Sequence, residues 1–120
     1  MSELTSSAVR IERGTSRRIR VPIYLDSTKR RPDDVTGWTG KLWVKRKPLD
    51  PAEAALLEVV GTVDIPLKEF WVDLTWAMTD ALPVGDHVWE VRVTTASNKK
   101  YAIVEAGSPF VVFERGSDSP

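Results

Sequence analysis

The segment Phe70-Trp-Val-Asp-Leu-Thr75 alternates apolar and polar side chains with a period of two residues. Because successive side chains of a β-strand point to opposite faces, Phe70, Val72 and Leu74 are expected to face a core. The same alternation runs through His87-Val-Trp-Glu-Val-Arg-Val93, whereas helical periodicity is nearly absent from the chain. The sequence therefore predicts a protein built from amphipathic β-strands.

Further strands are expected on both sides of these two segments. Residues 19–25 and 40–45 alternate in the same way, and Pro22 favours an edge or a bulge for its strand because proline has no N–H to donate. Weaker strand patterns cover residues 8–12, 56–63, 100–105 and 110–114. Seven or eight short strands spaced about ten residues apart are typical of an all-β, antiparallel β-sandwich.

The inward positions follow from this alternation in three strands. They are Leu42, Val44, Val72, Leu74, Val91 and Val93. Lys41 and Glu90 fall on the opposite faces of their strands, so truncating either to Ala should change stability little. Two short segments have helical character, residues 51–57 and 76–81, and only the second is expected to form a helical turn.

Length and composition fit one domain. The chain has 120 residues, 42% hydrophobic and 28% charged, and it has no cysteine. This excludes disulfides and cysteine-ligated metal sites, and we expect a β-sandwich over residues 8–114 with flexible tails at 1–7 and 115–120. No apolar run approaches the roughly 20 residues of a membrane span, and the first residues do not resemble a secretory signal. We therefore expect no membrane partner, and a protein that stays in the producing cell unless it leaves as part of a larger object.

Charge is balanced overall but unevenly distributed. Through Lys47 there are twelve basic and five acidic residues, so the first part carries +7 and the remainder −7. A net charge of zero argues against a general nucleic-acid binder. The two halves are expected to pair strands of opposite charge within the domain. The alternative is a dipolar module whose basic face meets the acidic face of a neighbour.

Candidate catalytic and metal-binding motifs are lacking in the sequence. His87 is the only histidine, and its place on the apolar side beside Trp89 favours a packed, hydrogen-bonded side chain. The stretch 36–41 lacks the spacing of a phosphate loop, and no G-x-S-x-G elbow or calcium loop occurs. We therefore expect a protein that is not an enzyme and holds no metal or cofactor.

The five tryptophans are the remaining chemical signal. Trp89 fits the core, Trp38 and Trp76 fit the ends of the sandwich, and Trp43 and Trp71 fall on polar strand faces. Outward tryptophans favour subunit contact first, partial burial under loops second, and stacking on sugars or bases third.

Read in order, several short segments resemble the immunoglobulin-like domains of tailed bacteriophages related to the N-terminal domain of baseplate upper proteins. The resemblance covers residues 8–114, and its segments are Ile11-Glu-Arg-Gly14, residues 19–25, Asp34-Val-Thr-Gly37 with Leu42-Trp-Val-Lys-Arg46, residues 70–75, Thr79-Asp-Ala-Leu-Pro-Val-Gly85, residues 87–93, residues 101–105, Gly107 and Phe110-Val-Val112. The sequence departs from the family at His87, Trp89 and Glu90, where the family usually has Tyr, Tyr and Asp.

The resemblance implies an immunoglobulin-like fold and a structural protein of the virion, made in the host cytoplasm and located in the tail, the baseplate or on the capsid. Its partners would be other virion proteins, with a homo-oligomer such as a trimer or ring as a possibility. No catalytic or ligand residues carry over from the family. We expect protein contacts at Arg17, Arg18, Arg20, Tyr24, Trp43 and Trp71. The alternative is a sandwich that binds carbohydrate or another cell-surface polymer.

Overall fold

The computed structural model describes residues 8–25, 28 and 30–114, so the expected tails at 1–7 and 115–120 lie outside the described residues. The elements are β1 (Val9–Glu12), β2 (Arg17–Pro22), β3 (Thr39–Lys45), the short 3-10 helix η1 (Ala52–Ala54), β4 (Leu57–Val60), β5 (Thr62–Asp64), β6 (Glu69–Leu74), α1 (Trp76–Asp80), β7 (Gly85–Thr94) and β8 (Lys100–Phe113). The protein is therefore all-β apart from two short helical turns.

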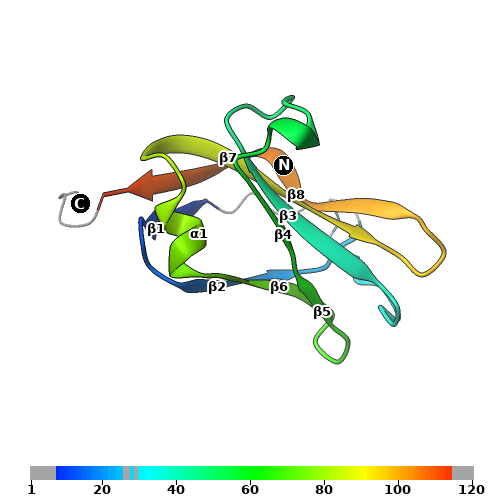
Figure 1. Cartoon of the computed structure of the whole chain (residues 1–120). Coiled ribbons are helices and arrows are strands. Elements are labelled where there is room, and N and C mark those ends of the chain that lie inside the picture. The colour runs from blue at the N-terminus through cyan, green and yellow to red at the C-terminus, as the bar shows by residue number, and fades with distance from the viewer. Residues whose placement is uncertain (1–7, 26–27, 29, 115–120) are drawn as a thin grey trace.

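The strands form two sheets that pack against each other. One sheet has the order β1-β8-β7-β3-β4 and the other the order β2-β6-β5, and they appear as an upper and a lower layer in Figure 1. Strand β1 pairs with β8 in parallel, whereas the other pairings are antiparallel. As its proline predicts, β2 lies at the edge of its sheet.

The core lies between the sheets, and both contribute to it. Every residue that alternation assigned to the interior is buried, namely Leu42, Val44, Val72, Leu74, Val91 and Val93. Trp89 and Phe110 pack edge to face with ring centroids 6.3 Å apart. The predicted register of these strands is thus correct.

Several predicted boundaries are wrong, and one of them is the strand expected over residues 19–25, which as β2 covers Arg17–Pro22. The expected strands 100–105 and 110–114 form one strand, β8, because Gly107 adopts a φ of +100° within the strand and the pairing with β7 continues through register shifts. The expected strand 56–63 is instead divided into β4 and β5, which belong to different sheets.

Gly61 is the residue at which the chain crosses from one sheet to the other. Its N–H donates to the carbonyl oxygen of Gly40 over 3.1 Å. A Cβ atom on Gly61 would overlap the Phe70 ring and lie 2.6 Å from the carbonyl oxygen of Trp71. The absence of a side chain therefore lets the strand switch sheets directly over a buried aromatic ring.

Ion pairs connect the basic first part of the chain to the acidic remainder, as the pairing interpretation predicted. Five ion pairs among the described residues join a cation before residue 48 to a carboxylate after it: Arg13–Glu114, Arg18–Asp73, Arg20–Glu69, Lys41–Glu58 and Lys45–Glu90. Much of the charge asymmetry is therefore neutralised inside the domain.

One end of the molecule carries α1. The hydroxyl of Thr75 accepts from the N–H of Met78 and caps the helix. The buried hydroxyl of Thr79 accepts from the N–H of Gly14 over 3.0 Å and donates to the carbonyl of Thr15 over 2.8 Å. These bonds hold the turn between β1 and β2 against the helix.

Candidate functional site

Three of the predicted contact residues meet on the outer face of the three-stranded sheet. The Arg18 guanidinium lies 4.1 Å from the centre of the Trp71 ring and donates to both carboxylate oxygens of Asp73, over 2.7 and 3.0 Å. Arg20, directly opposite Trp71 in the sheet, pairs with Glu69 over 3.2 Å. The structure thus brings Arg18, Arg20 and Trp71 together, but both arginines already have carboxylate partners.

Electrostatics agree with this geometry. The hydrogen bond to Asp73 raises the pKa of Arg18, and the bond from Arg18 holds the pKa of Asp73 below its ordinary value. An internal carboxylate already neutralises the Arg18 guanidinium and occupies its Nε and Nη2, so Arg18 would attract an acidic partner less strongly than an unpaired arginine.

Arg17 and Tyr24 lie elsewhere and have bracing contacts. Arg17 Nη1 donates to the carbonyl oxygen of Arg10 over 2.6 Å, which links β2 to β1. Tyr24 lies beneath the Arg31 guanidinium at 5.4 Å, and Arg31 also donates to the carbonyl oxygens of Leu67 and Lys68. Both contacts hold neighbouring segments of the fold together.

Trp43 lies on the outer face of the opposite sheet, so the predicted contact residues do not form one surface. Lys41 Nζ is 5.7 Å from the centre of its ring and pairs with Glu58 over 2.8 Å, which lowers the pKa of Glu58. Among the described residues, the buried Nε1–H of Trp43 has no partner that meets hydrogen-bond geometry. An interaction with Trp43 also lowers the pKa of Glu58, after the larger effect of Lys41.

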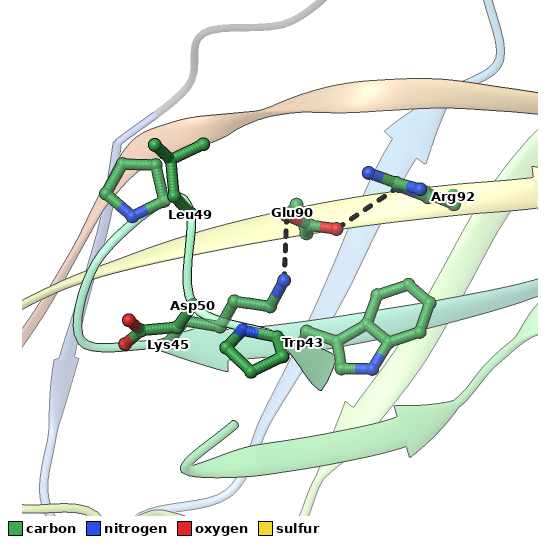
Figure 2. Close-up of a pocket in the computed structure, with 8 residues that line it drawn as sticks. Trp43, Lys45, Leu49, Asp50, Glu90 and Arg92 are labelled. Atoms are coloured by element: carbon green, nitrogen blue, oxygen red, sulfur yellow. Dashed lines mark hydrogen bonds and ion pairs between the residues drawn. The ribbon is translucent and has the colours of Figure 1, made fainter. Parts of the chain in front are cut away.

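Next to Trp43 lies a buried charge network that sequence reasoning missed. Glu90 accepts a hydrogen bond from Lys45 over 3.3 Å and forms an ion pair with Arg92, with Nε 3.2 Å from the carboxylate, as Figure 2 shows. The side chains of Lys45 and Glu90 are only 8% and 6% exposed. Alternation correctly placed Glu90 on the outer face, but the carboxylate is buried and paired, so its loss should cost more stability than alternation alone predicted.

The segment that follows β3 buries this pair. Pro48, Leu49, Asp50 and Pro51 line a hollow of about 390 Å³ together with Trp43, Lys45, Glu90 and Arg92 (Figure 2). From the sequence, this segment is predicted only as a turn that contains two prolines. That prediction does not indicate which part of the sheet the turn lies against.

A second hollow, of about 550 Å³, lies on the other side of Trp43. It is lined by Thr39, Gly40, Lys41, Trp43, Val60, Arg92, Thr94 and Lys100. Trp43 and Arg92 line both hollows, so the two hollows are neighbours on the outer face of β3 and β7. The cations, hydroxyls and indole that line the second hollow are groups that can bind a polar ligand. This lining does not contain a nucleophile paired with a general base.

The lone histidine lies in the core as predicted. His87 is buried, and its Nε2 donates to the carbonyl oxygen of Pro83 over 2.7 Å. Within the described part of the chain, no group of three or more His, Cys, Asp or Glu side chains is placed to hold a metal ion. Over the same residues, no helix is long and apolar enough to cross a membrane.

No protein-family model matches the chain, and no curated protein matches it significantly.

Proposed function

We propose that this protein is a non-enzymatic structural component of a tailed-bacteriophage particle, in the tail, the baseplate or as a decoration of the capsid. It acts through contacts with other virion proteins, in several copies around a symmetry axis. It is made in the cytoplasm of the host bacterium and functions in the virion.

The strand order supports the immunoglobulin-like fold on which the proposal rests. With β2, β6 and β5 taken as strands B, E and D, and β3, β7 and β8 as C, F and G, the pairings follow the immunoglobulin arrangement. Strand β4 then corresponds to the extra strand beside C that variable-type domains have. This agrees with the family that the sequence resembles.

Exposed apolar side chains on separate loops are the observation that carries the proposal. Leu49, in the segment after β3, is 96% exposed, and Trp76, at the start of α1, is 62% exposed. The turn between β5 and β6 presents Ile65, Pro66 and Leu67 in a row. A single exposed apolar residue is ordinary. Here such residues lie on the segment after β3, on α1 and on the turn between β5 and β6, which are at the top, side and bottom of the domain in Figure 1. This distribution suits a module that contacts several neighbours.

The experiment is to locate the protein in purified particles and to test reassembly with loop variants. Leu49→Ser and Leu67→Ser remove apolar contact area at exposed tips, where the isolated fold loses little. Full burial of a leucine contributes about 1.5–3 kcal/mol, so incorporation of each variant should fall about tenfold or more if that tip is an interface.

Lys47→Ala is the matched control, since Lys47 is exposed on the same segment as Leu49. It should assemble like the parent protein. Absence of the protein from purified particles would overturn the proposal, and normal incorporation of both leucine variants would overturn the role of the loop tips.

A further inference from the structure

The larger hollow beside Trp43 has an electrostatic character of its own. Three cations line it, Lys41, Arg92 and Lys100, and its lining includes no carboxylate. Lys41 and Arg92 stand directly opposite each other on β3 and β7, a cross-strand arrangement of like charges that normally destabilises a sheet. Lys41 pairs with Glu58, whereas Lys45 and Arg92 share the single carboxylate of Glu90, so a positive excess remains beside the hollow. An additional negative charge would therefore be stabilised there.

The orientation of Arg92 is restrained by an ion pair with its neighbour on the same strand. Its Nε forms an ion pair with the buried carboxylate of Glu90, which also pairs with Lys45. The arginine side chain remains 55% exposed, and its terminal amino groups have no other hydrogen-bond partner among the described residues. A guanidinium held in this way is prepared to bind a carboxylate through two parallel hydrogen bonds.

The floor of the hollow favours a sugar over a polypeptide segment. Strands β3 and β7 each pair with a neighbour on both sides, so neither offers a free backbone edge to an added strand. Recognition there depends on side chains, namely the hydroxyls of Thr39 and Thr94, the cations, and the Trp43 indole. Hydroxyls, an aromatic ring and a guanidinium together match a polyhydroxylated ring that bears an acid group.

We propose that this hollow binds a hexuronate unit of an acidic polysaccharide, with the sugar carboxylate on Arg92 and the sugar ring against Trp43. The volume of about 550 Å³ lies within the range of about 300–1,000 Å³ found for small-ligand sites. The inference is independent of the proposed role in a particle and concerns a different surface from the apolar loop tips.

Calorimetric titration of the purified full chain with an oligogalacturonate tests the proposal. The carboxyl-reduced oligosaccharide of the same length serves as the neutral probe, and an oligoglutamate peptide serves as the acidic polypeptide probe. We expect binding of the oligogalacturonate that weakens with salt, and much weaker binding of the other two probes.

Variants locate the site. Arg92→Lys keeps the positive charge but removes the two parallel N–H donors of the guanidinium. The affinity for oligogalacturonate should fall about tenfold or more, because a charge-assisted hydrogen bond is lost. Lys100→Gln, at an exposed position on the rim, should weaken binding by a smaller factor and provides a second variant if Arg92→Lys perturbs the fold.

The opposite sheet provides the matched control. Arg18 also lies over a tryptophan on an outer sheet face, but one edge of its guanidinium is bound through Nε and Nη2 to both oxygens of Asp73, which neutralises its charge. Arg18→Lys should therefore leave the affinity for oligogalacturonate unchanged. No binding, equal binding of the neutral probe, tighter binding of the peptide, or equal loss with Arg18→Lys would each overturn the proposal.

Discussion

The pair formed by Lys45 and Glu90 shows how a charged side chain on the outer face of a sheet becomes interior. Both residues point away from the core, yet the segment after β3 covers them. Taking two charges out of water is costly, and their attraction only offsets this cost while both partners are present. We therefore expect the intact pair to contribute little net stability, whereas the loss of one partner should be costly.

Glu90→Gln should reduce the free energy of unfolding by about 3–5 kcal/mol, because it leaves the buried Lys45 without a carboxylate. Urea unfolding followed by circular dichroism measures the loss. Glu58→Gln is the control, since the pair of Glu58 with Lys41 is exposed and should contribute less than about 1 kcal/mol.

The double variant Lys45→Met with Glu90→Leu separates pairing from packing. Replacing a buried ion pair by apolar side chains of similar size is often neutral or stabilising. The double variant should recover most of the stability that Glu90→Gln loses. A double variant less stable than Glu90→Gln would show that the pair itself is a major source of stability.

Acid sensitivity should arise in part from Asp73 and Glu58. Hydrogen bonds from Arg18 and Lys41 hold the pKa values of these carboxyls below their ordinary values. A carboxyl whose pKa is lower in the folded state stabilises that state above the unfolded pKa, near 4, and the contribution disappears as pH falls through the folded pKa. The free energy of unfolding should therefore decrease below about pH 4.

Urea midpoints measured at about pH 5 and about pH 3 should differ less in Asp73→Asn than in the parent protein. In the parent protein, high salt should also reduce the difference between the two midpoints, because the pair of Arg18 and Asp73 is exposed and its attraction is screened. An unchanged pH dependence in Asp73→Asn would show that other groups account for acid sensitivity.

At the scale of single residues, the sequence predicted the faces of strands well and their surroundings poorly. Alternation gave the correct side for Leu42, Trp43 and Glu90. It could not reveal that Glu90 is buried or that Arg18 is bound to Asp73, because both facts depend on segments distant in sequence.

Among the elements, the switch between β4 and β5 has the strictest steric requirement. Gly61→Ala should destabilise the protein by about 1–3 kcal/mol, because the new methyl group would overlap the Phe70 ring and crowd the backbone of β6. The denaturation midpoint measures the effect. Val60→Ala, at the exposed neighbouring position, should stay within about 0.5 kcal/mol of the parent. Equal stability of both variants would mean that the strand can cross by another path.

Element types were predictable where alternation is long, as in β3, β6 and β7. The predicted strand boundaries near Gly61 and Gly107 were wrong. Gly61 was expected within a strand and ends one, whereas Gly107 was expected at a break and lies inside β8. The difference lies in what surrounds each glycine: the Phe70 ring at Gly61, and continued pairing with β7 at Gly107.

For the whole molecule, one core shared by two sheets implies a single cooperative transition. Buried side chains from β2 and β6 pack with those from β3, β7 and β8 in one cluster. Thermal melts followed by far-ultraviolet and near-ultraviolet circular dichroism should coincide. They should also overlay with and without EDTA or a thiol reductant, since the chain has no cysteine. Separate transitions, or a shift of several degrees with EDTA, would contradict this expectation.

The site was less predictable than the fold for a reason of scale. The sequence identified Trp43 and Trp71 as outward residues, but it gave no means of knowing that they lie on opposite sheets. The groove beside Trp43 depends on the covering segment and on cross-strand neighbours such as Lys41 and Arg92, which only the tertiary structure places together.

The parallel pairing of β1 with β8 also governs when the fold can be completed. Val9 is opposite Phe110, about a hundred residues later in the chain, so the first strand waits for the last to be synthesised. At about 5–20 residues per second, this delay lasts several seconds. During that time Val9 and Ile11 lack the strand partner that later helps to bury them. Refolding of the full chain should likewise be slow for its size, in the millisecond-to-second range of topologies dominated by distant contacts.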